Sequence, residues 1–322
     1  MKVGTFTVLY QDKSFEETLD KLKGMGVEAV EIGTGNYPGS NHCKPDDLLD
    51  KPERIGKFKK AISERGMIIS GLSCQGNPLH PNKGISDENH KVWVNTVKLA
   101  KQMEVDTVNC FSGCPGDGPN ATVPNWVTCA WPPEFAELRK WQWDEVVVPY
   151  WKEQSKFAQD HGIKIAIEMH PGFVVYNTET LLELRKRAGD NIGANIDPSH
   201  LIWQGMDPVE IIKVLGDNDA IYHFHAKDTY IDERNKAING VLDTKNYGDF
   251  LNRSWSFRTI GYGMSLQKWK TIFSVLQATG FDGVISIEHE DQLASRDEGL
   301  QRAIDTVKSA ILKDKPDEMW WA

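Results

Sequence analysis

The sequence alternates between short aliphatic stretches and longer amphipathic ones, and this alternation constrains the fold more than any other feature. The aliphatic stretches predict buried strands, and the amphipathic stretches predict helices that often start at a capping Ser or Asp and stop at a Gly. Ser14, for example, precedes a helix with Glu17 at its capping-box position. Strands are predicted at residues 3–9, 27–33, 67–73, 105–111, 163–168, 192–197, 220–226 and 283–288. Helices are predicted at residues 15–25, 57–65, 87–103, 143–161, 178–188, 207–215, 265–280 and 296–312.

Eight strands in strict alternation with helices predict parallel strands joined by crossover helices. An open doubly wound sheet usually carries a glycine-rich turn after its first strand, whereas residues 10–13 here are Tyr-Gln-Asp-Lys. We therefore predict an α/β fold, a single (β/α)8 TIM barrel over residues 1–313, followed by a tail over residues 314–322. The tail ends in Met319, Trp320 and Trp321, which we expect to dock on a neighbouring surface or a partner subunit.

Two of the predicted strand-to-helix connections are much longer than the others. Residues 112–142 follow the fourth strand and residues 229–263 follow the seventh, and both are rich in aromatic side chains. Long loops in a compact domain are usually functional lids or disordered segments, and the aromatic content argues against disorder. We expect both connections to roof the mouth of the barrel and to supply an aromatic wall.

Charge and cysteine content exclude several functional classes. The net charge of −9 and the pI near 5.5 argue against a nucleic-acid groove and against binding to an anionic membrane. No apolar run approaches transmembrane length, and residues 1–9 lack the layout of a secretory signal, so we expect a soluble, cytoplasmic protein. Five cysteines without a repeating spacing fit reduced thiols better than a disulfide framework.

Four successive predicted strands end on ionisable side chains, namely Glu168, Asp197, His225 and Glu288. In a closed barrel such side chains converge at the carboxyl ends of the strands. Any one of them could be an ordinary strand-end group in a salt bridge, but four on successive strands favour a common site. Three carboxylates and one imidazole suit one divalent metal ion, with Mn²⁺ the leading candidate and Mg²⁺, Co²⁺ or Zn²⁺ as alternatives. Without a cation, the carboxylates would repel one another and take up protons.

Alternation along the seventh strand places His223 and His225 on the same face. We assign the ligand role to His225 because it lies level with the other three groups. His223 would lie deeper, either as a supporting hydrogen-bond donor or as a core histidine. Lys227 faces inward with His225 and could hold a developing oxyanion, whereas Asp228 points the other way and would cap the following loop.

His170 and His200 lie just beyond Glu168 and Asp197. Either histidine could bond a substrate hydroxyl or relay a proton, although each could also simply bond the loop backbone. We expect Glu168, Glu288 and His170 to be catalytic. The expected substrate contacts are His200, Lys227, Arg258, His80 and Trp126.

The strand ends resemble those of the xylose-isomerase-like TIM-barrel superfamily. Its sugar isomerase and epimerase branch includes ketose 3-epimerases and inosose isomerases and dehydratases. The resemblance covers essentially the whole chain and implies a divalent metal at Glu168, Asp197, His225 and Glu288. It also implies acid and base roles for Glu168 and Glu288, and substrate contact for His200. The matching stretches are Ile167-Glu168-Met169-His170-Pro171-Gly172, Ile196-Asp197-Pro198-Ser199-His200, His223-Phe224-His225-Ala226-Lys227-Asp228 and Ile287-Glu288-His289-Glu290.

The sequence departs from the ketose 3-epimerases at two places. Position 174 is Val where those enzymes usually carry a second glutamate, and the nearest arginine after the seventh-strand histidine is Arg234, inside a longer insertion. These departures argue against a free ketohexose as substrate. The insertion and residues 257–263 also resemble sugar phosphate isomerase/epimerase-type relatives, and the barrel subunits of enzymes that eliminate aglycones from 3-keto-glycosides.

The sequence therefore predicts a metal-dependent sugar isomerase or epimerase that removes a proton α to the metal-bound carbonyl of a sugar, cyclitol or keto-sugar. The alternative is a metal-dependent lyase or dehydratase acting on a keto-sugar or 3-keto-glycoside, including C-glycoside-type deglycosylation. The acidic charge disfavours a nucleic-acid endonuclease of the same superfamily, and the complete ligand set disfavours a barrel that only binds sugar. We expect a small carbohydrate substrate, no nucleic-acid or membrane partner, and a homo-oligomer or a hetero-oligomer with a small partner subunit.

Overall fold

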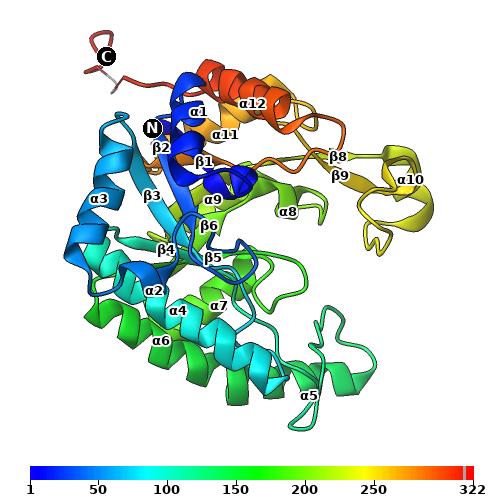
Figure 1. The fold of residues 1–322 in the computed structure, drawn as a ribbon. Helices are drawn as coiled ribbons and strands as arrows, with labels where there is room; N and C mark the ends of the chain where they lie inside the picture. Colours follow the sequence, from blue (N-terminus) through cyan, green and yellow to red (C-terminus); the bar gives the residue numbers. More distant parts are fainter. Residues whose placement is uncertain (315–316) are drawn as a thin grey trace.

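The computed structural model describes residues 1–314 and 317–322 and confirms the predicted barrel (Figure 1). Eight parallel strands close in the order β1-β10-β7-β6-β5-β4-β3-β2. Because β5, β6, β7 and β10 are successive neighbours in this order, their carboxyl ends share one sector of the barrel mouth. The strands are β1 (Lys2–Phe6), β2 (Ala29–Gly33), β3 (Ile68–Ser73), β4 (Thr107–Cys110), β5 (Lys164–Glu168), β6 (Ile192–Ile196), β7 (Ile221–Ala226) and β10 (Val284–Ile287).

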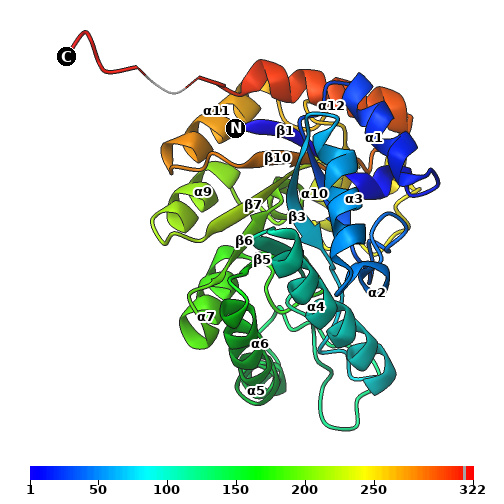
Figure 2. The ribbon, with the colours of Figure 1, turned by 60° about the vertical axis from the view of Figure 1, so that its left-hand side comes forward.

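Helices form the outer layer of the barrel (Figure 2). They bury one face against the strands, as where Phe224 of β7 meets Phe273 of α11 with ring centroids 6.0 Å apart. Removing such apolar surface from water stabilises the fold by about 25 cal/mol per Å². The main helices are α1 (Phe15–Gly24), α3 (Pro52–Ser63), α4 (Lys83–Met103), α6 (Val148–Asp160), α7 (Thr178–Ala188), α9 (Pro208–Gly216), α11 (Leu266–Ala278) and α12 (Arg296–Ala310).

Local capping explains where several helices begin. The capping box of Ser14 and Glu17 is present at the start of α1, as predicted. The predicted cap at Ser86 is wrong, because the side chain of Asn82 accepts a hydrogen bond from the backbone of Gly84 and starts α4 earlier. The helix predicted from residue 143 also starts earlier, since α5 (Pro133–Trp141) continues through the π-helical η2 (Gln142–Val147) into α6.

The connection after β7 has secondary structure of its own and is not a plain loop. Strands β8 (Asp228–Ile231) and β9 (Trp255–Arg258) pair antiparallel, with α10 (Glu233–Asn239) and the short η3 (Phe250–Asn252) between them. We call residues 228–258 the hairpin lobe. Figure 1 shows that the lobe and α5 project on the same side of the barrel.

The hairpin lobe has a small core. The guanidinium of Arg253 is buried near the rings of Tyr247 and Trp255, at 4.5 and 4.6 Å from their centroids. Trp203 stacks on Trp255 with ring centroids 4.7 Å apart. Asp228, at the base of the lobe, accepts hydrogen bonds from Gly261, Gly263 and Met264, so it caps the following loop as expected. These contacts fix the lobe on the rim of the barrel.

The C-terminal tail extends away from the barrel (Figure 2). Met319, Trp320 and Trp321 are exposed, and the docking of this segment and the oligomeric state remain predictions. Residues 315 and 316 of the predicted tail lie outside the described residues. None of the described helices combines the length and the hydrophobicity needed to span a lipid bilayer.

Candidate metal centre and active site

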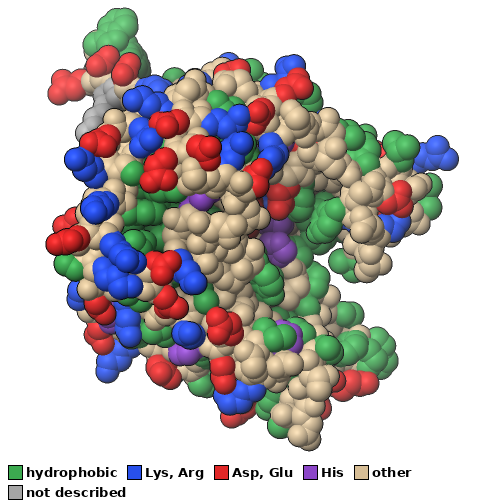
Figure 3. Space-filling view, in the orientation of Figure 1, with side chains coloured by type: hydrophobic (Ala, Val, Ile, Leu, Met, Phe, Trp, Pro, Cys, Tyr) green, Lys and Arg blue, Asp and Glu red, His purple; other side chains and the backbone are tan. Residues whose placement is uncertain are grey.

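A cavity of about 480 Å³ opens at the carboxyl ends of the barrel strands. Figure 3 shows this hollow between the hairpin lobe and the α5 region, with histidine side chains inside it. Part of its lining is polar and comes from strand ends and the residues after them. The rest is largely aromatic and includes Phe6, Tyr37, Phe111, Tyr247 and Phe257.

The four side chains predicted to bind metal lie together at this mouth. One ligand atom from each of Glu168, Asp197, His225 and Glu288 lies within 4.8 Å of the others. Glu168 is the last residue of β5, Asp197 and Glu288 directly follow β6 and β10, and His225 is the penultimate residue of β7. The convergence therefore follows from strand neighbourhood and from the level at which each strand ends.

Two atoms of this group have no hydrogen-bond partner among the described residues. Oδ2 of Asp197 and Nδ1 of His225 are both buried. Their contacts are ion pairs, since Oδ2 of Asp197 lies 3.2 Å from Nζ of Lys227 and Nδ1 of His225 lies 3.3 Å from Oε2 of Glu288. A divalent cation would satisfy both atoms, and three carboxylates with one imidazole are a suitable donor set for it. The residues present therefore fit a metal ion.

Lys227 supplies the positive charge closest to these carboxylates. Its Nζ lies 2.9 Å from Glu288, 3.1 Å from Glu290 and 3.2 Å from Asp197. Burial would lower the pKa of Lys227, but the three carboxylates outweigh burial and raise it well above its ordinary range. The ammonium therefore stays charged and faces the cavity.

The two glutamates of the group differ in their electrostatic environment. Burial raises the pKa of Glu168 to about 8, and the nearby charges of Glu288 and Asp197 add to this effect. Burial would also raise the pKa of Glu288, but Lys227 and His225 outweigh it and lower that pKa below its usual range. In the ion-free site, one carboxyl group thus holds a proton at neutral pH while the other is ionised.

His170 and His200 both line the cavity, with ring centroids 4.0 Å apart. Nδ1 of His170 donates to the carbonyl of Pro171 over 2.6 Å, which leaves Nε2 as the acceptor of that ring. Burial lowers the pKa of His170 to about 4, so the ring is neutral. Nε2 of His200 lies 3.4 Å from both Glu168 and Asp197, and burial lowers its pKa well below the usual range.

Three predicted substrate contacts do not line the cavity. Arg258 donates from Nε to Asp291 over 3.0 Å, and His80 accepts a hydrogen bond from the backbone of Asn82. Trp126 packs against Tyr176. Each of the three side chains is held by a local partner, and their substrate role stays a prediction.

The expected aromatic roof is also only partly correct. The hairpin lobe contributes Tyr247, Ser256 and Phe257 to the cavity wall, but no residue of 112–142 lines it. Part of this connection forms α5, and its aromatic side chains lie elsewhere, since Trp131 and Phe135 are exposed and Trp126 packs against Tyr176. The aromatic wall therefore comes from the lobe and from residues near the ends of β1, β2 and β4.

The structure also brings in polar residues that sequence reasoning missed. Nε2 of Gln75 donates to Oε2 of Glu168 over 3.2 Å, and Glu290 bonds Lys227. Glu31, on β2, accepts a hydrogen bond from Nε2 of His225. A sequence signal for Glu31 existed, since it is a lone carboxylate inside the apolar stretch Ala29–Gly33. His223 lies deeper than His225, where its Nδ1 is 3.0 Å from Oδ1 of Asn195.

Residues 19–310 match the family model described as the xylose isomerase-like TIM barrel. The chain belongs to this family. It is 37% identical over 314 residues to the uncharacterized protein YfiH of Bacillus subtilis, which covers 97% of this chain and 99% of that protein. It is also 30% identical over 139 residues to an inosose dehydratase of Clostridium botulinum, which covers 42% of this chain and 43% of that enzyme.

Two solved structures share the fold of this chain. A D-tagatose 3-epimerase-like protein superposes with a TM-score of 0.63 at 21% identity, covering 96% of this chain and 99% of that one. The IOLI protein with a bound zinc atom superposes with a TM-score of 0.63 at 19% identity, covering 97% of this chain and 99% of that one. At these identities the superpositions support the barrel alone, and the chemistry has to be argued from the site.

Proposed function

We propose that this protein is a divalent-metal-dependent sugar isomerase or epimerase acting on a sugar, cyclitol or keto-sugar. The observation that carries the proposal is the convergence of Glu168, Asp197, His225 and Glu288 beside the cavity that Glu168 and Glu288 line, with two of their buried atoms making no hydrogen bond. The names of the relatives, an inosose dehydratase and a D-tagatose 3-epimerase-like protein, fit such a substrate class.

Glu168, Asp197, His225 and Glu288 would hold one ion, for which Mn²⁺ is our leading candidate and Mg²⁺, Co²⁺ and Zn²⁺ are alternatives. When bound, such an ion would polarise a substrate carbonyl and stabilise negative charge developing on its oxygen. The carboxylates place their charge around the ion, and the aromatic wall limits the access of water to it.

The residues of the chain would then carry the proton. A carboxylate oxygen of Glu168 or Glu288 takes the hydrogen from the carbon next to the carbonyl, so that a C–H bond breaks and an O–H bond forms. Return of a proton to the opposite face of the same carbon gives an epimer. Return to the neighbouring carbon gives an isomer, with the hydroxyl proton of the enediolate moving to the former carbonyl oxygen.

Three further side chains would orient the substrate. Lys227 and His200 are placed to donate hydrogen bonds to substrate oxygens at the cavity floor, since both line it. His170 offers its unprotonated Nε2 as an acceptor for a substrate hydroxyl or as a second proton carrier. A neutral imidazole suits either role near neutral pH.

The aromatic wall favours a second candidate, a lyase or dehydratase acting on a keto-sugar or 3-keto-glycoside. Phe111, Tyr247 and Phe257 would pack against a flat aglycone next to the reacting ring. The first step is the same removal of a proton. The bond to the β-substituent then breaks, its electron pair leaves with the substituent, and an acid of the site supplies a proton to it.

Turnover in D₂O tests the proposal, using purified protein loaded with Mn²⁺ and a panel of keto-sugars, inososes and aryl 3-keto-glycosides. We expect deuterium at the carbon α to the carbonyl, in an epimerised or isomerised product or in recovered substrate. An elimination product identifies the second candidate. Complete retention of the original hydrogen, by a hydride shift between neighbouring carbons, would contradict proton abstraction. Purified protein that retains no divalent metal and binds none would contradict the metal centre.

A further inference from the structure

We infer that Glu31 is a positioning residue for the metal ligand His225. Its carboxylate holds the Nε2–H group of that imidazole and so leaves the Nδ1 lone pair for the ion. The inference rests on the proposed metal centre, and it assigns the tautomer and the orientation of the ligand. Glu31 itself would not touch the ion.

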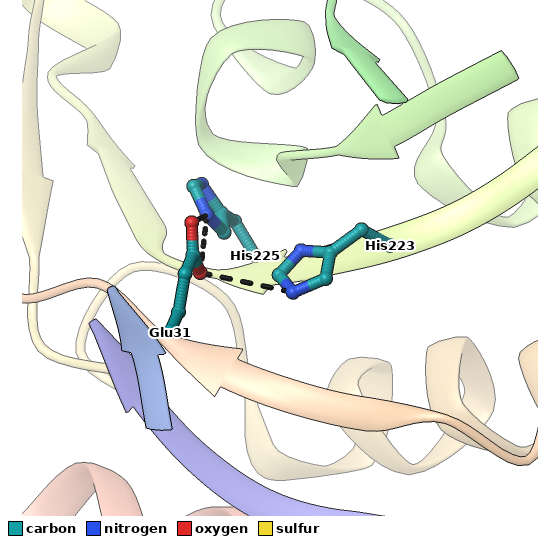
Figure 4. A group of neighbouring side chains, drawn as sticks. All are labelled: Glu31, His223 and His225. Atoms are coloured by element: carbon teal, nitrogen blue, oxygen red, sulfur yellow. Dashed lines mark hydrogen bonds and ion pairs between the residues drawn. The ribbon is translucent and has the colours of Figure 1, made fainter. Parts of the chain in front are cut away.

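Figure 4 shows Glu31 on β2 facing His225 and His223 on β7. Nε2 of His225 lies 2.9 Å from both carboxylate oxygens of Glu31. Nε2 of His223 lies 3.8 Å from Oε2, which is too long for a hydrogen bond. Glu31 and His225 are both completely buried. The strong contact of this cluster is therefore the one between Glu31 and His225.

The remaining acceptor positions of Glu31 are also occupied. Oγ of Ser73 and Nδ2 of Asn109 donate to Oε1, and Oγ of Ser286 donates to Oε2. Together with His225, these donors satisfy both carboxylate oxygens. Glu31, His223 and His225 lie close enough to suggest a second metal site, but a cation there would have to displace these hydrogen bonds. The cluster is therefore better explained as a hydrogen-bonded support beneath the metal centre.

His223 is engaged in a similar way. The amide nitrogen of Asn195 is directed at Glu168, so its amide oxygen faces His223. This oxygen accepts a hydrogen bond from Nδ1 of His223 over 3.0 Å. The proton of His223 is thus on Nδ1, and the hydroxyl of Ser70 lies 3.4 Å from Nε2. This arrangement connects the floor of the barrel to Glu168 and leaves His225 as the histidine that faces the ligand group.

The contact with Glu31 determines which nitrogen of His225 faces the metal centre. A carboxylate can only accept, so the proton between the two groups is on Nε2 of His225. In the metal-loaded site the lone pair is then on Nδ1, which lies 3.3 Å from Glu288 and 3.6 Å from Glu168. Nδ1 has no hydrogen-bond partner among the described residues. A carboxylate behind a ligating imidazole orients the ring and increases its basicity towards metal.

The decisive comparison is between Glu31→Gln and Ser286→Ala, measured as the Kd for Mn²⁺ by calorimetry. Ser286→Ala is the matched control, because it removes a hydrogen bond to Glu31 but none to His225. We expect Glu31→Gln to weaken binding about 10–100-fold. Ser286→Ala should weaken it about threefold or less. Equal affinity in wild type and Glu31→Gln, or an equal loss in both variants, would overturn the inference while leaving the metal centre intact.

A spectroscopic measurement reads the proton on His225 in the wild type and uses a variant only to assign its resonances. In protein labelled with ¹⁵N-histidine and loaded with Zn²⁺, the resonances of His225 are assigned as those missing from His225→Asn. We expect a proton on Nε2 and none on Nδ1. A proton on Nδ1, or two Mn²⁺ ions bound per chain, would overturn the inference. A wild type that binds no divalent ion would refute the proposed function itself, and the positioning role with it.

Discussion

At the scale of single residues, neighbouring groups in the candidate site shift the pKa values of similar side chains in opposite directions. Burial and nearby negative charge raise the pKa of Glu168, whereas Lys227 lowers the pKa of Glu288. His170 and His200 are buried and kept neutral, whereas Glu31 and Glu168 keep the pKa of His225 above its ordinary value despite burial. Such divergence lets a small set of residue types provide an acid, a base and hydrogen-bond donors at one pH.

Substituting either glutamate of the metal group should abolish most turnover. We expect Glu168→Gln and Glu288→Gln to lower kcat by about 10²–10⁴-fold even where metal is retained, because an amide cannot accept the substrate proton. The control is Glu290→Gln, because Glu290 also bonds Lys227 but is outside the ligand group. This variant should lower kcat by about fivefold or less. Metal content is measured alongside kcat. Wild-type turnover in either metal-loaded glutamate variant would exclude that residue as the base.

Metal binding should release protons at pH 7. In the ion-free site, the pKa of Glu168 is raised to about 8, so this carboxyl group is protonated, and the pKa of His225 is also raised. A divalent ion needs both groups deprotonated. Calorimetric titration with Mn²⁺ in buffers of different ionisation enthalpy would measure the release. The number of protons released by Glu168 should decrease as the pH rises through about 8. Uptake of protons on metal binding would contradict the expectation.

At the scale of elements, the hairpin lobe decides what can enter the cavity. Strands β8 and β9 hold Phe257 over the site, where its ring centroid lies 4.7 Å from Nζ of Lys227. Tyr247 stacks on Phe257 from the connection between them, at 5.7 Å between ring centroids. The lobe has its own small core around Arg253, and Trp203 from the connection after β6 stacks on Trp255 to hold it against the barrel.

Removing one ring of the lobe should change specificity. We expect Tyr247→Ala to raise the KM of an aryl-substituted keto-glycoside several-fold, consistent with about 0.5–1.5 kcal/mol for an aromatic contact. The KM of an unsubstituted keto-sugar should change less. Tyr230→Ala is the control, because Tyr230 is on β8 of the same lobe but does not line the cavity. An equal effect of Tyr247→Ala on both substrates would argue against an aromatic subsite.

At the scale of the whole molecule, the closed barrel gathers like charges that the isolated chain would keep apart. Glu168, Asp197 and Glu288 meet in a buried site, where the cations of the chain only partly balance them. If the site holds the proposed ion, the ion would relieve this repulsion, and stability and metal binding would be coupled through barrel closure.

Adding Mn²⁺ should raise the melting temperature, and a chelator should lower it again. Binding to the folded state alone stabilises by about 2.7 kcal/mol when the free ion is at 100 times its Kd. Asp197→Asn should lose most of this shift, because it removes one ligand from the group. Thermal melts of metal-loaded and chelator-treated protein provide the measurement. Identical melting temperatures in the two states would contradict the coupling.

The sequence by itself determined the barrel and the place of the four candidate metal ligands at the carboxyl ends of its strands. The alternation of strands and helices is a local pattern, and the inward direction of residues such as Glu168 and His225 follows from the period of two in a strand. Parallel strands then bring their carboxyl ends to one mouth without further information. These features were predictable because each depends only on residues close together in the chain.

Only the tertiary structure decided the partners of those residues. Glu31 meets His225 across 194 positions of sequence, and no local pattern encodes that contact. The same holds for the cavity wall, since the connection after β7 supplies Tyr247 and Phe257 while no residue of the equally aromatic stretch 112–142 lines it. For the same reason, no sequence pattern could show that Arg258, His80 and Trp126 do not line the cavity. A loop side chain goes where packing and hydrogen bonds satisfy it, and those partners exist only after the barrel has closed.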